Sequence, residues 1–408
     1  MRTFTKGIGF FILTSLFLVG NSQAAIEHSL INDNNQNIST RSFHETTELA
    51  ELLWNEQSAK FIEQYENEKY REAYKTAMRV YNLAENNFGL NDVNTADSLL
   101  KLGIITQIMG DMAKAEDYLY GALVILEDQL KPGNPDIAIA LTNLGNLYYD
   151  KKEFDKVEEF HKKALSIRLK AFGKEDSSVA QSNYNLGVLY ENTGEYDKAE
   201  NHYREALSIW TQVYGPLHPY IGNTLANLTN TYIAHKKLSN AILTQQRIVA
   251  FKKSTLGIDH QEVAQSLIDL GSLYVEQGQY DVAGGTYKEA LNIAKDFLKP
   301  TDPQLAMLMY TLANTYHMQA RMEEPGDSFP NNDVLSDTIA QDKNLQTTIL
   351  VQQALPLYVR AAEILDAKQK TENQTALQAV LSELAMLYKA IGEEDKAIET
   401  ESRISMNH

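Results

Sequence analysis

Apolar and small residues recur along most of the chain with a period of 42 residues, which a leucine marks. The marker occurs in six copies, at Leu102, Leu144, Leu186, Leu228, Leu270 and Leu312. The residue after it is small in most copies, which lets two helices approach closely, and a tyrosine follows four positions after the leucine in five copies, at Tyr148, Tyr190, Tyr232, Tyr274 and Tyr316. Six copies of one spacing identify a repeat protein.

The apolar positions within one period follow the spacing of amphipathic helices. In the copy that Leu144 marks, they predict a first helix over about 135–150 and a second over 154–171. Second helices are expected to end at Gly89, Gly173, Gly215 and Gly257. In the other two copies, Lys131 and Lys299 replace this glycine. N-caps are expected three residues after each stop, at Asp92, Asn134, Asp176, His218, His260 and Asp302, and prolines follow at 135, 219 and 303. Each unit is therefore predicted to be helix, turn, helix.

These residues resemble the tetratricopeptide repeat, because Leu144-Gly145-x-x-Tyr148 is followed by Phe154, Val157 and Ala164. The 42-residue period and the linkers between units are similar to the kinesin-light-chain type, which is also common in bacterial proteins. The match covers most of residues 45–400. The resemblance implies an all-α fold, a right-handed superhelical solenoid of about eight antiparallel helix pairs. It also implies that the first helices line a concave groove that binds peptides or proteins.

The pattern weakens at three places. Residues 45–88 are expected to form an atypical N-terminal cap with Trp54 in its core. Residues 321–350 contain Pro325, Gly326 and Pro330 and six acidic against two basic residues, so we expect an acidic, solvated insertion between two helices, which resume near Val351. In the copy that Leu228 marks, Thr229 replaces the small residue. The repeat array is expected to span residues 45–408, including this insertion.

The first 24 residues have the pattern of a secretory signal peptide, with Arg2 and Lys6 before an apolar run over 8–19 and small residues at 22 and 24. Residues 25–44 are then expected to be a flexible tether. The apolar run is short for a membrane span, which needs roughly 20 residues. The sequence therefore predicts an exported protein, periplasmic or secreted, without a stable membrane span after cleavage.

Charge and composition restrict the partner and the chemistry. The net charge of −17 disfavours nucleic acid as the main partner, and a neutral or basic protein or extended peptide is easier to accommodate. The chain has no cysteine, so thiolate metal sites and cysteine nucleophiles are excluded. It also lacks a G-x-S-x-G motif, a phosphate loop and a helical pair of metal-binding histidines. We expect no enzyme and no cofactor.

One face of the first helices is rich in side-chain amides. It is formed by the positions five and one before the marker leucine and two and six after it, which share one side of a helix. An amide offers a donor and an acceptor, which suits the backbone of an extended peptide. The alternative is that these amides bond neighbouring helices or face water. The candidate partner-binding residues are Asn143, Asn146, Gln181, Asn185, Asn192, Asn223, Asn227, Asn230, Asp269 and Asn314.

Two other sets of residues have simpler explanations than ligand binding. The five recurring tyrosines suit packing, and His218 and His260 occupy a position that Asp or Asn fills in other copies, which favours capping over a shared metal. The leading hypothesis is a non-enzymatic protein-interaction scaffold. The alternative is a structural subunit of an envelope or secretion assembly that uses the convex face, the ends or the insertion.

Overall fold

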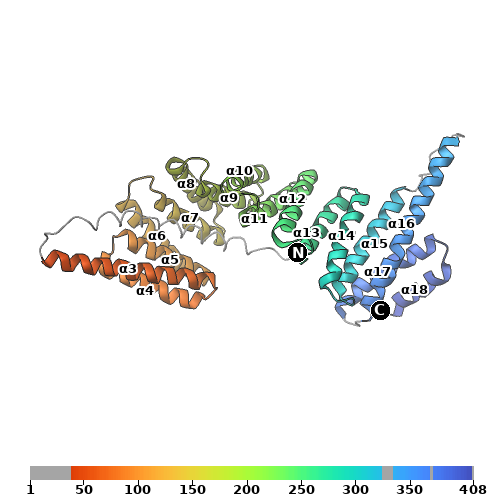
Figure 1. Cartoon of the computed structure of the whole chain (residues 1–408), viewed down its shortest axis with the longest axis horizontal. Coiled ribbons are helices and arrows are strands. Elements are labelled where there is room, and N and C mark those ends of the chain that lie inside the picture. Colours follow the sequence, from red (N-terminus) through yellow and green to blue (C-terminus); the bar gives the residue numbers. More distant parts are fainter. Residues whose placement is uncertain (1–37, 324–333, 368–370, 407–408) are drawn as a thin grey trace. The chain divides into compact units, whose positions relative to one another are not determined.

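The structure, a computed structural model, describes residues 38–323, 334–367 and 371–406, and all regular secondary structure in these ranges is α-helical (Figure 1). The predicted signal peptide and residues 25–37 lie outside the described residues. The chain divides into two compact units, Met1–Asn227 (unit 1) and Leu228–His408 (unit 2).

The 16 described helices follow one another as eight pairs, each a first helix and a second helix. The first helices are α3 (Ile38–Glu66), α5 (Val93–Ile108), α7 (Pro135–Asp150), α9 (Ser177–Asn192), α11 (Pro219–Ala234), α13 (Gln261–Glu276), α15 (Pro303–Glu323) and α17 (Thr371–Ala390). The second helices are α4 (Tyr70–Phe88), α6 (Met112–Gln129), α8 (Phe154–Phe172), α10 (Tyr196–Tyr214), α12 (Leu238–Leu256), α14 (Tyr280–Phe297), α16 (Val334–Asp366) and α18 (Glu394–Met406). The predicted all-α fold of helix pairs is confirmed.

Helix boundaries follow the capping residues. The carboxylate of Asp176 accepts a hydrogen bond from the backbone N–H of Ser178 at 2.8 Å, and equivalent bonds begin the other first helices whose caps were predicted. His218 and His260 do the same through Nδ1, at 3.3 and 3.2 Å. Both histidines are therefore N-caps. At the other end, Gly173 stops α8 with a φ of 82°, a left-handed conformation that favours glycine.

Two predicted irregular segments contain more helix than expected. Helix α3 begins at Ile38, so residues 38–44 are helical and not part of a tether. Helix α15 continues to Glu323 and α16 begins at Val334, so residues 334–350 are also helical, whereas residues 324–333 lie outside the described part. The reason is local, because residues 38–44 and 334–350 contain neither proline nor glycine and nothing in them stops a helix.

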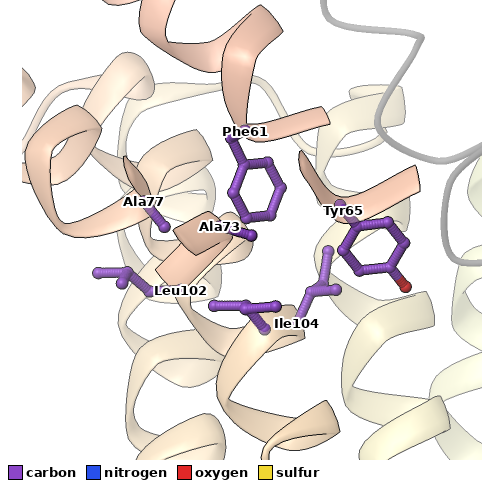
Figure 2. Close-up of a cluster of buried hydrophobic side chains, with 7 residues drawn as sticks. Phe61, Tyr65, Ala73, Ala77, Leu102 and Ile104 are labelled. Atoms are coloured by element: carbon purple, nitrogen blue, oxygen red, sulfur yellow. The ribbon is translucent and has the colours of Figure 1, made fainter. Parts of the chain in front are cut away.

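The N-terminal pair packs on the next repeat through a continuous apolar core (Figure 2). Phe61 and Tyr65 of α3 meet Ala73 of α4 and Leu102 and Ile104 of α5, and all five are buried. The middle of α3 is held by Trp54, whose ring is buried against Val80 and Ala84. Its Nε1–H donates to Ser98 Oγ at 2.9 Å. Trp54 thus fills the core of the N-terminal cap, as predicted.

The small residue after the marker leucine makes room for a large side chain 16 positions later, on the second helix of the same pair. A Cβ atom on Gly187 would lie 2.6 Å from the ring of Tyr203, and one on Gly145 would lie 2.6 Å from the ring of His161. In the copy with Thr229, where glycine is absent, the neighbouring side chains differ. Thr229 donates to Thr244 at 2.8 Å, and the residue in the place of the ring is Gln245, which donates to the Ser266 carbonyl at 3.0 Å.

Because Gly187 leaves the space that the Tyr203 ring fills, Gly187→Thr should destabilise unit 1 by about 1–3 kcal/mol through overpacking. Adding Tyr203→Gln recreates the Thr–Gln combination, so the double variant should lose less stability than the sum of the two single changes. Urea unfolding followed by tryptophan fluorescence measures this in unit 1, because both tryptophans, Trp54 and Trp210, are buried there.

The control is Gly121→Thr in α6. A Cβ there would have one ordinary contact, 3.5 Å from Leu99, so the change should be nearly neutral. Additive effects of Gly187→Thr and Tyr203→Gln would show that the two positions do not compete for the same space.

The recurring tyrosines join neighbouring repeats. Tyr190 of α9 is 2% exposed and donates to Glu158 of α8 at 2.6 Å, and Tyr148 of α7 donates in the same way to Glu116 of α6. Lys151 reaches the same Glu116 at 2.7 Å. These contacts confirm that Tyr148 and Tyr190 are packing residues.

Candidate functional site

The first-helix face, meaning the four positions that were predicted to be rich in amides, is largely closed over α5, α7 and α9. Asn143 is 1% exposed and Gln181 is 6% exposed. On α5 the same positions hold Asp97 and Lys101, a buried ion pair with the Lys101 ammonium 5.1 Å from the centroid of the Trp54 ring. Asn143 and Gln181 are therefore corrected to interior residues, because neighbouring helices in unit 1 pack too closely to leave them a surface.

Several polar side chains of unit 1 are bonded between neighbouring first helices. Gln107 of α5 donates to Asp150 of α7 at 2.7 Å, and Asn227 of α11 donates to the Tyr184 hydroxyl of α9 at 2.9 Å. For Asn227 the alternative, an amide that bonds an adjacent helix, is therefore the better description, whereas Asn192 donates to the Val188 carbonyl of its own helix at 2.8 Å.

Two acidic side chains lie near Tyr149 of α7. The pKa of Tyr149 is raised to about 12, first by burial and then by the carboxylates of Glu191 and Asp150. Burial also raises the pKa of Glu191, whose carboxylate accepts from the Tyr203 hydroxyl at 2.6 Å. Polar side chains in this part of unit 1 thus form hydrogen bonds with one another.

The remaining candidates are more accessible. Asn146, Asn185 and Asn314 are half-buried, whereas Asn192, Asn223, Asn230 and Asp269 are exposed. On α13 and α15 of unit 2, two exposed residues of this face were not predicted, Gln265 and Met307. Both stand five residues before a marker leucine. The first-helix face is most open in unit 2.

A groove of about 670 Å³ lies between α13 and α15, with the end of α14 between them. Apolar side chains dominate its lining, and two of them, Phe297 and Met307, are each 39% exposed although they are large. Amides and a hydroxyl add polar groups at Gln261, Gln265, Gln304 and Thr311. The other lining residues are Glu262, Ala264, Ile268, Ala294, Leu298, Pro303 and Leu308.

The sequence contained a signal for this groove. Met307 and Thr311 stand five and one residues before Leu312, the same offsets that Gln265 and Asp269 have before Leu270. The recurrence of side-chain amides does not indicate these two residues, because this part of the face combines methionine and threonine with amides. Methionine is flexible and polarisable, so it adapts to differently shaped apolar partners.

Carboxylates continue from the groove along α13. Gln265 in the groove donates to Asp269 at 3.0 Å, and Glu276 lies exposed two turns further on. Although Asp269 is exposed to solvent, the protein around it desolvates the carboxylate and raises its pKa. Glu262 forms an ion pair with Lys252 at 3.3 Å. Along α13, Asp269 and Glu276 are the carboxylates near the groove that form no ion pair among the described residues.

A second groove, of about 740 Å³, lies on the second helices of unit 1 between α6 and α8. Tyr120, Leu123 and Phe160 supply apolar surface, and Lys163 at its edge is paired with Glu159 at 2.7 Å. Charges of both signs line it, since Glu127 and Lys156 are also present.

Among the described residues, no group of three or more histidine, aspartate and glutamate side chains could hold a metal ion. None of the described helices combines the length and the apolar character needed to cross a membrane.

Comparison with known proteins agrees with this architecture. The tetratricopeptide repeat model matches residues 94–170, 178–254 and 262–324, which together are more than half of the chain. The chain belongs to the tetratricopeptide repeat family. Proteins of this family bind proteins or peptides, and the fold generally serves as a non-enzymatic scaffold. None of the curated proteins with which the chain was compared matches it.

Solved structures with similar helix pairs include BtubC (BKLC) from P. vanneervenii, with 21% identity, a TM-score of 0.44, and coverage of 65% of this chain and 94% of that one. A putative kinesin light chain from P. anserina has 20% identity and a TM-score of 0.46, with coverage of 51% of this chain and 99% of the other. The apo form of RapI has 16% identity and a TM-score of 0.45, with coverage of 74% and 98%.

Proposed function

We propose that this tetratricopeptide repeat protein is an exported scaffold that holds a segment of a partner protein on the first-helix face of unit 2. The supporting observation is the groove between α13 and α15, about 670 Å³ in volume, where Phe297 and Met307 are exposed beside amides that can bond a peptide backbone. Export is supported by the signal-peptide pattern of the first 24 residues. Periplasmic or secreted location is part of this proposal.

A second candidate function uses the other groove. A structural subunit of an envelope or secretion assembly would dock through its second helices, and the groove of about 740 Å³ between α6 and α8 offers apolar surface for such a contact. We rank it lower because its charged edges, such as Lys163 with Glu159, are paired within the protein.

The absence of cysteine from the chain allows a direct test. Single variants Met307→Cys, Ser166→Cys and Lys288→Cys carry a thiol-directed photo-crosslinker in the first groove, in the second groove and on the exposed surface of α14, respectively. After irradiation in the native host, a specific partner should crosslink to position 307 and not to 288.

Each outcome distinguishes the two functions. Crosslinking through position 166 alone would favour the structural subunit. The same bands from all three positions, or none from 307, would contradict partner binding in the α13–α15 groove.

A further inference from the structure

The groove between α13 and α15 contains information about the chemistry of its occupant. Among its lining residues there is no lysine, arginine or histidine. One lining residue, Glu262, is acidic, and it is already paired with Lys252. The interior of the groove is therefore apolar and amide-lined, without a basic group that could hold an acidic side chain or a free carboxylate.

The surface that leads out of the groove along α13 is acidic. Asp269 is connected to it through the hydrogen bond from Gln265, and Glu276 follows two turns later. The structure has no ion pair to either of these carboxylates among the described residues. A partly desolvated carboxylate gains more from a cation than a fully solvated one does, because water screens it less.

We infer that the α13–α15 groove selects a partner segment with an apolar anchor side chain followed by lysine or arginine. The anchor would lie against Phe297 and Met307, and the basic residues would lie along α13 beside Asp269 and Glu276. This inference rests on the proposed function, since it specifies the partner of the same groove.

The selection works in both directions. A basic residue beside Asp269 forms a charge-assisted contact, whereas an acidic residue there meets a like charge, which is repulsive. The anchor supplies most of the buried apolar area, so the amides need only satisfy the backbone of the segment. A neutral segment with the same anchor should bind with intermediate affinity.

The test uses three fluorescein-labelled peptides of equal length with the full-length protein. One has two leucines flanked by lysines, one has glutamates in place of the lysines, and one has serines in place of the leucines. In fluorescence anisotropy at moderate salt, the lysine–leucine peptide should bind at least about tenfold more tightly than either of the others.

Protein variants locate the contact. Asp269→Asn with Glu276→Gln should weaken the lysine–leucine peptide about tenfold, and Met307→Lys should abolish its binding. The charge-matched control is Asp117→Asn with Glu205→Gln, two exposed carboxylates on second helices, which should change the affinity less than twofold. Circular dichroism checks that each variant keeps its helix content.

The outcomes separate this inference from the proposed function. Equal or tighter binding of the glutamate peptide, or no loss in the Asp269/Glu276 variant, would overturn the basic selection. A partner crosslinked through position 307 that has no basic segment at the contact would also overturn it and leave the scaffold function intact. If no peptide binds and position 307 crosslinks nothing, both proposals fail.

Discussion

Leu144→Ala should lower the free energy of unfolding of unit 1 by about 2–5 kcal/mol, the range for a fully buried leucine. Leu144 is completely buried on α7, a helix that packs against α8 of its own pair and α6 of the preceding repeat. Its removal leaves a cavity that the surrounding helices can close only in part, because Gly145 beside it already permits the closest approach to His161.

The fluorescence of Trp54 and Trp210 again provides the measurement, since both are buried in unit 1. Leu169→Ala on α8 is the matched control, because Leu169 is 41% exposed and its truncation should cost less than about 1 kcal/mol. Equal costs for the two leucines would mean that the marker position is not the core of the repeat.

Acid should destabilise unit 1 through His161. This histidine is buried, and desolvation, with a smaller contribution from the nearby Arg168, lowers its pKa from 6.5 to about 3. In the unfolded chain the pKa returns to about 6.5. Between these values the unfolded state binds the proton and the folded state does not. The free energy of unfolding therefore falls as the pH decreases, by about 1.4 kcal/mol per pH unit, and this part of the stability is complete only above pH 6.5.

His161→Leu should remove this contribution, so that the stability of the variant declines less steeply between pH 6.5 and 4. The substitution suits the site, because Leu119 occupies the same place against Gly103 in the preceding repeat. Urea titrations at several pH values give the slope. His260→Asn, which changes an exposed N-cap histidine, should keep the slope of the wild type, and a parallel decline in wild type and His161→Leu would exclude His161 as its source.

Much of the fold could be predicted because its determinants are local. Asp176 and His260 begin helices through bonds to residues only two positions away, and Gly173 ends one through its own backbone conformation. Such relations are visible in the spacing of a single sequence. Helices α3 and α16 were underestimated because residues 38–44 and 334–350 have no strong amphipathic pattern, although they also have no helix breaker.

The binding face was harder to predict because burial depends on how closely separate helices approach. Asn143 and Asp269 stand one residue before a marker leucine in their respective repeats, but the first is buried and the second is exposed. That difference comes from the neighbouring first helices, which are distant in sequence. Asn227 likewise has the offset of a groove residue, but the hydroxyl that it bonds belongs to Tyr184, 43 positions earlier.

The contacts of the recurring tyrosines imply that the packing of adjacent repeats is more sensitive to acid in unit 1 than in unit 2. In unit 1 the coupling of α6 to α7 and of α8 to α9 depends on Glu116 and Glu158, whose pKa values are lowered by bonds to lysine and tyrosine. In unit 2, among the described residues, the tyrosines of α13 and α15 form no hydrogen bond to a carboxylate, although burial and, to a smaller extent, the nearby Asp281 raise the pKa of Tyr316. Tyr274 accepts from Gln246 at 2.6 Å, and the Tyr316 ring packs against Gly284. In a one-dimensional array, each interface contributes separately to cooperativity. Protonation would therefore uncouple repeats of the N-terminal unit while those of the C-terminal unit, which contains the α13–α15 groove, stay coupled.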